Sequence, residues 1–243
     1  MSFSGKRYWL IGASEGLGAA LAKALALSGA HVVVSARAEN KLQALAAQLP
    51  NVNTAPLDVT DMAAVQHTAE RLGPLDGIVY LAGYYDPMKA QNWESGAVAQ
   101  MTAVNFTGAL NVLGAIVPGF VGRNAGHIVL IGSLAGYRGL PGSIGYGASK
   151  AALMHMGETL YADLHNTGVK VQNINPGFIK TRLTAKNTFQ MPQLMQPEEA
   201  AEHVLKAMRS NRFETAFPKP FAWLFTWAKF TPRKLWLKLF SKV

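Results

Sequence analysis

Tyr146 and Lys150 are the residues of this chain whose types and spacing point most directly to chemistry. Side chains four residues apart lie on one face of a helix, so the ammonium of Lys150 can approach the phenol of Tyr146. A nearby positive charge lowers the pKa of a phenol and makes it a proton donor or acceptor near neutral pH. Thirteen residues earlier, Ser133 ends an apolar run. The set indicates oxidation or reduction at a carbonyl if a hydride carrier binds, although the Tyr–Lys pair alone would also suit a solvated helix face.

The N-terminus offers a place for such a carrier. The apolar stretch 8–11 runs directly into a turn that contains Gly12, Gly16 and Gly18. Leu17 then begins a helical pattern. Glycines in a strand-to-helix turn let backbone N–H groups approach a pyrophosphate at the helix N-terminus. The turn predicts a dinucleotide site, although turns of this kind also occur without a nucleotide.

The rest of the pattern predicts how these residues are brought together. Short apolar runs read as strands and alternate with segments of helical periodicity; the runs are 8–11, 31–35, 53–57, 77–82, 127–131, 170–174 and 214–217. Strands that are apolar throughout are typical of a parallel sheet covered on both faces. A chain of 243 residues suits one domain. We therefore expect an α/β fold, a single doubly wound Rossmann-type domain with a parallel sheet of about seven strands flanked by helices.

Irregular segments at 83–93, 134–144 and 176–197 each follow an expected strand. Ligands of doubly wound sheets bind beyond the carboxyl ends of the strands. These segments are therefore expected to build the substrate pocket.

Taken together, these residues resemble the short-chain dehydrogenase/reductase family over about residues 5 to 215. The motifs stand in the family's order and spacing: Gly12-x-x-x-Gly16-x-Gly18, Asp58-Val59, Ala82-Gly83, Asn105, Ser133, Tyr146-x-x-x-Lys150 and Pro176-Gly177. Each motif is common, but the ordered set is specific. The resemblance implies a catalytic group of Asn105, Ser133, Tyr146 and Lys150.

The resemblance also implies a role for each member of this group. Tyr146 would protonate the alkoxide as hydride reaches the carbonyl carbon, and Ser133 would donate to the developing oxyanion. Lys150 would lower the pKa of the phenol and bind the nicotinamide ribose. Asn105 would hold a water next to the lysine.

The same resemblance implies a set of cofactor-binding residues. They are Gly12, Ser14, Glu15, Gly16, Leu17, Gly18, Arg37, Asp58, Val59, Ala82, Gly83, Tyr146, Lys150, Pro176, Gly177, Ile179 and Thr181. Asp58 would accept a hydrogen bond from the adenine amino group. Alternatively, Asp58 or Thr60 caps the next helix, and both roles are compatible.

Cofactor choice depends on the end of the second expected strand. An acidic residue there would bind the ribose 2′-hydroxyl of NAD and repel a 2′-phosphate, but this chain has Ala36 followed by Arg37. The guanidinium of Arg37 can pair with a phosphate, and Ser14 can donate its hydroxyl. NADP(H) is therefore favoured over NAD(H). Glu15 argues the other way, because some NADP-dependent relatives carry a basic residue at that position.

Composition and charge exclude several kinds of site and partner. The chain has no Cys, which excludes disulfides and thiolate metal sites, and its six His lack metal-ligand spacing, so no metal is expected. The N-terminus shows no signal peptide, and a cytoplasmic location is expected. The formal net charge is +9, and six of the basic residues lie in 218–243, which has no acidic residue. No nucleic-acid-binding module accompanies this charge, so a nucleic-acid partner is not expected.

We expect two parts in the chain: residues 1–217 form the catalytic domain, with a substrate lid at about 178–197, and residues 218–243 form a basic aromatic tail. Apolar residues of the loops predict a pocket for a bulky or lipid-like ketone or alcohol; they are Tyr84, Tyr85, Trp93, Tyr137, Leu140, Leu183, Phe189, Met191, Leu194 and Met195. The alternative is that they pack under the loops.

The tail also leaves two interpretations open. A basic helix with aromatic anchors suits peripheral contact of residues 219–243 with a membrane, at its inner face. Alternatively, these aromatics pack on the domain or on a sister subunit, since the family resemblance implies a homodimer or homotetramer.

The sequence thus predicts an NADP(H)-dependent oxidoreductase that reduces a carbonyl, or oxidises the matching secondary alcohol, of an apolar small-molecule substrate. One alternative is an NAD-dependent alcohol dehydrogenase of the same family. The other is a catalytically inactive nucleotide-binding regulatory protein, because a fold alone does not fix a function.

Overall fold

The computed structural model of the protein describes residues 2–240. Within these residues the centre is a seven-stranded parallel sheet in the order β3-β2-β1-β4-β5-β6-β7. The strands are β1 (Arg7–Ile11), β2 (His31–Ser35), β3 (Val52–Thr54), β4 (Gly77–Tyr80), β5 (Gly126–Ile131), β6 (Val169–Pro176) and β7 (Glu214–Phe217). The chain winds from β1 to one edge, returns to β4 and winds to the other edge. The carboxyl ends of β1 and β4 therefore form the switch point at which doubly wound sheets bind ligands.

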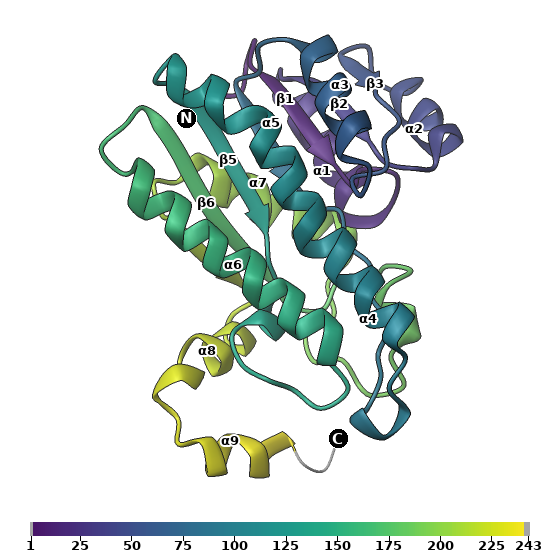
Figure 1. The fold of residues 1–243 in the computed structure, drawn as a ribbon, viewed down its shortest axis with the longest axis vertical. Helices are drawn as coiled ribbons and strands as arrows, with labels where there is room; N and C mark the ends of the chain where they lie inside the picture. Colours follow the sequence, from purple (N-terminus) through teal and green to yellow (C-terminus); the bar gives the residue numbers. More distant parts are fainter. Residues whose placement is uncertain (1, 241–243) are drawn as a thin grey trace.

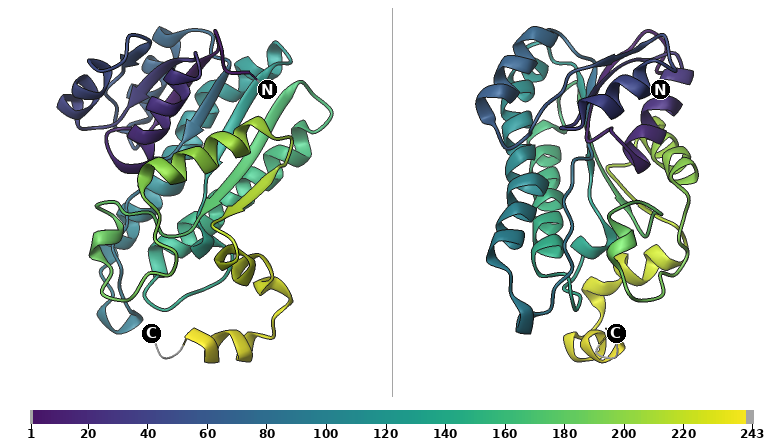
Figure 2. Two further views of the ribbon diagram at one scale, coloured as in Figure 1. Left: turned by 180° about the vertical axis from the view of Figure 1, so that it is seen from behind. Right: turned by 90° about the vertical axis from the view of Figure 1, so that its right-hand side faces the viewer.

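Helices cover both faces of the sheet, as Figures 1 and 2 show. One face carries α1 (Gly16–Leu27), α2 (Glu39–Ala46) and α7 (Pro197–Arg209), and the other carries α3 (Met62–Leu72), α4 (Ser95–Thr102), α5 (Gly108–Gly122) and α6 (Ile144–Leu164). Alternate residues of β1 serve the two cores: Tyr8 and Leu10 pack under α1, and Trp9 and Ile11 pack on the opposite side. Each such buried apolar side chain contributes about 1.5–3 kcal/mol. This explains why the strands are apolar throughout.

The predicted α/β fold is confirmed, and the strand bounds differ mostly by a few residues. The strands expected at 31–35 and 214–217 have the predicted bounds. The largest difference is β3, which covers Val52–Thr54 and not 53–57. Backbone hydrogen bonds to the β2 segment nevertheless continue beyond β3, from the N of Ala55 to the carbonyl of Val34 at 2.9 Å and from the N of Leu57 to the carbonyl of Ala36 at 3.1 Å.

The helices α4 and α5 are joined by a π-helical turn, Ala103–Thr107, into one continuous segment. Of the described residues 2–240, this segment, Ser95–Gly122, is the one long and apolar enough to cross a bilayer by length and composition. Its residues Ala109, Val112 and Phe120 belong to the core between helices and sheet. The core helices of folded proteins pass the same test, so this composition alone does not indicate a membrane span.

The chain continues beyond β7 into a region that we call the C-terminal lobe, residues 218–240. The lobe contains α8 (Phe221–Thr226), a 3₁₀ turn (Ala228–Phe230) and α9 (Arg233–Phe240). Figure 1 shows the lobe at the end of the molecule toward which β5 and β6 point. Ala222, Phe225 and Trp236 pack on Leu134 in a small core of their own. The lobe therefore packs on the domain in part; Lys242 of the predicted tail lies outside the described residues.

Candidate active site

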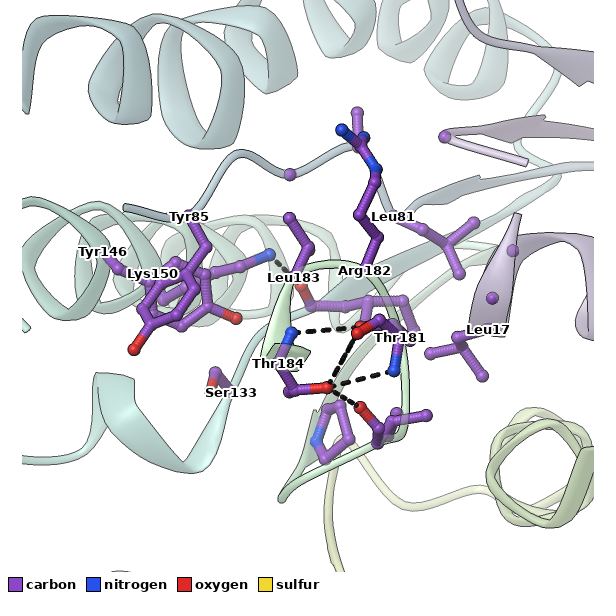
Figure 3. Close-up of a pocket in the computed structure, with 18 of the residues that line it drawn as sticks. Leu17, Leu81, Tyr85, Ser133, Tyr146, Lys150, Thr181, Arg182, Leu183 and Thr184 are labelled. Carbon is purple, nitrogen blue, oxygen red and sulfur yellow. Dashed lines mark hydrogen bonds between the residues drawn. The ribbon is translucent and has the colours of Figure 1, made fainter. Parts of the chain in front are cut away.

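A cavity of about 410 Å³ lies at the carboxyl end of the sheet. Every residue predicted to bind cofactor lines it, and so do Ser133, Tyr146 and Lys150 of the predicted catalytic group. Figure 3 shows Tyr85, Tyr146 and Lys150 grouped together, with Leu17 and Leu81 in another part of the cavity wall. The fold thus brings the glycine turn and the Tyr–Lys helix to one cavity, as the sequence predicts. Asn105 is the exception, because it is fully buried behind the wall.

The glycine turn is shaped for close backbone contacts. Gly12 has φ of +97°, and a Cβ there would lie 2.5 Å from the backbone N of Ala82 at the end of β4. A Cβ on Gly18 would lie 2.2 Å from the carbonyl oxygen of Gly12. Other residues would therefore force the turn apart.

The N-terminus of α1 presents its backbone N–H groups to the cavity. Glu15 precedes the helix but makes no side-chain capping bond, and the first turn contains no acidic residue. Uncapped N–H groups and the helix dipole favour an anion at this point. The turn therefore fits the pyrophosphate of a dinucleotide.

Glu15 is paired with two basic residues from other elements. Its Oε1 accepts from Nε of Arg182 at 2.6 Å, and its Oε2 accepts from Nζ of Lys41 at 2.6 Å. Both hydrogen bonds lower the pKa of Glu15. The charge of Glu15 is thus offset, and the cationic Arg37 lines the cavity nearby.

Asp58 follows β3 and turns onto Thr60. Its Oδ1 accepts from the backbone N of Thr60 at 3.0 Å and from Oγ1 of Thr60 at 2.8 Å. Partial burial raises the pKa of Asp58, but these bonds and the charge of Arg37 outweigh it and lower the pKa. The expectation that Asp58 or Thr60 caps α3 is wrong: Asp61 caps it, accepting from the N of Ala64 at 2.9 Å.

Tyr146 and Lys150 lie in the first turns of α6, beside Ser133 at the end of β5. The Ser133 hydroxyl is within hydrogen-bonding reach of the Tyr146 phenol. Nζ of Lys150 donates to the carbonyl of Ile131 at 2.8 Å and lies 5.9 Å from the centre of the Tyr146 ring. The ring of Tyr85 meets the ring of Tyr146 edge-on at 4.9 Å. The first turns of α6 and the residues that follow β5 thus lie around the Tyr146 phenol.

The electrostatics of the pair differ from the expectation. Burial raises the pKa of Tyr146, and its hydrogen bond with Ser133 only partly opposes this. Burial also lowers the pKa of Lys150 to about 8. The expected lowering of the phenol's pKa by Lys150 is therefore wrong for the protein alone. Desolvation by burial is the largest effect on the pKa of both groups, and the ammonium is bonded to the carbonyl of Ile131.

Asn105 occupies the π-helical turn between α4 and α5. Its Oδ1 accepts from the N of Tyr84 at 2.7 Å, and its Nδ2 donates to the carbonyl of Tyr84 at 3.0 Å and to Oγ of Ser149 at 2.9 Å. The side chain thus ties the loop after β4 to α6. π turns are frequent at functional sites because they widen the helix locally.

The segment after β6 is fastened across the cavity. Its two ends pair with each other, since Lys180 N donates to the carbonyl of Met195 at 2.9 Å. Its middle is joined to other elements by Arg182–Glu15, and by the Tyr85 hydroxyl, which donates to Oδ1 of Asn187 at 2.7 Å. The segment lies over the cavity in this arrangement.

Some of the predicted apolar pocket residues line the cavity and others do not. Tyr85, Leu140, Leu183 and Phe189 line it. Tyr84, Trp93, Tyr137, Met191, Leu194 and Met195 are absent from its wall; Met195 is buried in the main core, and Trp93 is exposed.

Two wall residues come from the C-terminal lobe and were missed by sequence reasoning: Phe221 and Phe225. Their spacing of four residues, on a helix that follows the last strand, is the signal that could have identified them.

Comparison with known proteins decides the family. The family model for short chain dehydrogenases matches residues 6–192. The chain belongs to the short-chain dehydrogenase family. An uncharacterized oxidoreductase of Myxococcus xanthus is 40% identical, with 92% of each chain covered. The protein is therefore an oxidoreductase of the kind that uses a nicotinamide cofactor at CH–OH or C=O groups.

Solved structures of other short-chain dehydrogenases are similar over nearly the whole chain. One from Burkholderia cenocepacia, in complex with NADP, has a TM-score of 0.88 at 26% identity and covers 99% of each chain. One from Streptomyces avermitilis has a TM-score of 0.86 at 26% identity, covering 100% of this chain and 98% of that one. The C-terminal lobe is thus included in these matches.

Proposed function

We propose that this short-chain dehydrogenase is an NADP(H)-dependent carbonyl reductase for an apolar or lipid-like substrate, working reversibly on the matching secondary alcohol. The observation that carries the proposal is the single cavity that holds the uncapped glycine turn together with Ser133, Tyr146 and Lys150. A hydride donor bound along this cavity would bring its reactive end beside the phenol.

The residues of the cavity would divide the work of reduction. NADPH would supply the hydride. Tyr146 donates its proton to the substrate oxygen, and Ser133 donates a hydrogen bond to the same oxygen as its negative charge develops. Lys150 supplies a positive charge beneath the phenol and a donor for the ribose. Asn105 positions the Tyr84 loop against α6, and by family resemblance it also holds a water next to the lysine.

Three features support NADP(H) over NAD(H). No acidic residue ends β2, where Ala36 and Arg37 line the cavity. The carboxylate of Glu15 is paired with Lys41 and Arg182. These two side chains bring positive charge to the position at which some NADP-dependent relatives carry a basic residue and this chain carries Glu15. Similar structures have been solved with NADP. A guanidinium–phosphate pair at Arg37 would be worth roughly 1.5–3 kcal/mol.

Apolar side chains in the wall of the cavity support the apolar substrate class. These side chains come from the loop after β5, the predicted lid and the lobe; they are Leu140, Leu183, Phe189, Phe221 and Phe225. Hydrophobic walls with a few polar groups bind apolar ligands in a fixed orientation.

A spectrophotometric assay tests this proposal. Purified protein is mixed with NADPH or NADH and a series of ketones of increasing chain length, and cofactor oxidation is followed. We expect turnover with NADPH that improves with chain length. Turnover only with NADH would support the NAD-dependent alternative, and binding of cofactor without turnover of any ketone or alcohol would support a regulatory protein.

A further inference from the structure

α8 carries apolar side chains on its outward side as well as on its inward side, and Thr226 at its end is its one residue with a hydroxyl. Its inward residues Phe221 and Phe225 line the cavity. Its outward residues Trp223 and Leu224 are exposed at 53% and 40%, and Trp227, just after the helix, at 65%. A helix that is hydrophobic all round is normally covered by protein or by lipid. The outward face of α8 is therefore suited to a partner.

α9 also exposes apolar side chains. Trp236 and Phe240 are four residues apart and pack their rings on Phe225, with centroids 5.7 and 6.2 Å away. Leu235 and Leu239 are also four residues apart, but they are exposed at 58% and 55%. One side of α9 thus holds the lobe together, and a neighbouring side presents leucines to the surroundings.

The lobe is held in a definite position on the domain. Nε1 of Trp236 donates to the carbonyl of Gly139 at 2.9 Å. Arg138 donates to the carbonyls of Ala228 and Thr231. These bonds fix the lobe to the loop after β5, so the outward aromatic side chains have a fixed orientation relative to the cavity.

The charge of the lobe identifies the partner. Residues 218–243 contain six basic and no acidic side chains, and Arg233 and Lys234 are exposed in the described part. Lys219 lies 5.9 Å above the ring of Trp223. Tryptophans and leucines interleaved with lysines are typical of helices that lie in the interface of an anionic bilayer. A twofold contact with a second copy would instead bring the same basic segments together, which is unfavourable.

We propose that the outward face of the C-terminal lobe docks on an anionic lipid surface. Docking places α8, a wall of the cavity, against the lipid, so that an apolar substrate reaches Tyr146 from the bilayer. This delivery step rests on the proposed function, whereas docking itself does not. Figures 1 and 2 show the lobe projecting from one end of the molecule, where it can meet a flat surface.

Co-sedimentation with vesicles tests docking. The full chain is mixed with vesicles of phosphatidylcholine alone or with one third phosphatidylglycerol. We expect binding to the anionic vesicles that weakens in high salt. Trp223→Ser/Trp227→Ser should weaken binding at least about tenfold. Arg233→Ala/Lys234→Ala should weaken vesicle binding about 30-fold. This variant removes positive charge from the N-terminus of α9, which does not destabilise a helix, so α9 should stay folded.

Matched variants elsewhere on the surface serve as controls. Leu27→Ser/Met62→Ser removes two exposed apolar side chains, and Lys23→Ala/Lys206→Ala removes the same charge as the basic double variant. Both should bind vesicles like the wild type. Wild-type protein that stays in the supernatant with anionic vesicles, or equal losses in the controls, would overturn the proposal. The docking proposal is also overturned if light scattering shows a dimer that Trp223→Ser/Trp227→Ser dissociates. In that case a second copy of the chain covers the outward face of the lobe.

A second measurement separates delivery from the proposed function. NADPH oxidation is followed with a short, water-soluble ketone and with a long-chain ketone held in anionic vesicles. We expect Trp223→Ser/Trp227→Ser to lose activity several-fold on the vesicle-held ketone only. Equal rates on that ketone for wild type and variant would refute delivery. Vesicle binding without turnover of either ketone would refute the proposed function and leave docking intact.

Discussion

Replacing Lys150 with Met should stabilise the protein near neutral pH while removing its activity. Lys150 is 3% exposed, and burial lowers its pKa to about 8. Met is also long and unbranched, so it can fill most of the same space. The variant therefore removes a buried charge with little change in packing.

The magnitude follows from the two pKa values. Lys150 titrates near 10.5 in the unfolded chain and near 8 in the folded protein. The folded state thus binds fewer protons between these values, and the cost of burying the charge is fully present below pH 8 and relieved as pH rises toward 10.5. The full cost is about 3 kcal/mol. Loss of the hydrogen bond to Ile131 offsets about 1 kcal/mol, which leaves a net gain of about 2 kcal/mol for Lys150→Met at pH 6.5.

Urea unfolding followed by tryptophan fluorescence measures this gain. The difference in unfolding free energy between variant and wild type is determined at pH 6.5 and at pH 9.5, so that all other titrating groups cancel. We expect the variant's advantage to shrink by about 2 kcal/mol at the higher pH. A difference that stays constant between the two pH values, or a variant that is less stable at both, would refute the argument that Lys150 is held at a cost to stability.

Other perturbations test separate parts of the site. Arg37→Asp should weaken NADPH binding about 10- to 150-fold in fluorescence titrations and favour NADH, while Arg71→Asp on the exposed side of α3 should not; unchanged preference would remove Arg37 from the phosphate site. Gly12→Ala should weaken NADPH binding and lower the melting temperature because its Cβ meets the backbone of Ala82, whereas Gly114→Ala has open space and should be neutral or stabilising. Phe221→Ala should raise KM for apolar ketones about tenfold without changing NADPH affinity, and an effect on cofactor alone would contradict its place in the substrate wall.

The sequence predicted the fold because the strands and glycine turns are locally specified. Val32, Val33 and Val34 are buried on both faces of the sheet, and such a run permits few other structures. The order of motifs then fixed which loops share the cavity. Residues from Gly12 to Thr181 were expected in one site, and all the expected cofactor contacts line one cavity.

Features that depend on tertiary contacts were not predictable. The pairing of Glu15 with Lys41 and Arg182 joins residues up to 167 positions apart, and no local pattern specifies it. The balance of pKa effects at Tyr146 depends on how completely the site excludes water. The contribution of Phe221 to the cavity depends on where the lobe folds back.

The proposed chemistry is tested most directly by Tyr146→Phe, which removes one oxygen and leaves the ring in contact with Tyr85. NADPH affinity is measured by fluorescence and reduction of an apolar ketone by single-turnover kinetics. The account predicts nearly unchanged NADPH affinity and a rate lowered by roughly 10²–10⁴-fold. A variant that reduces the ketone at a rate close to that of the wild type would contradict the assignment of Tyr146 as the proton donor.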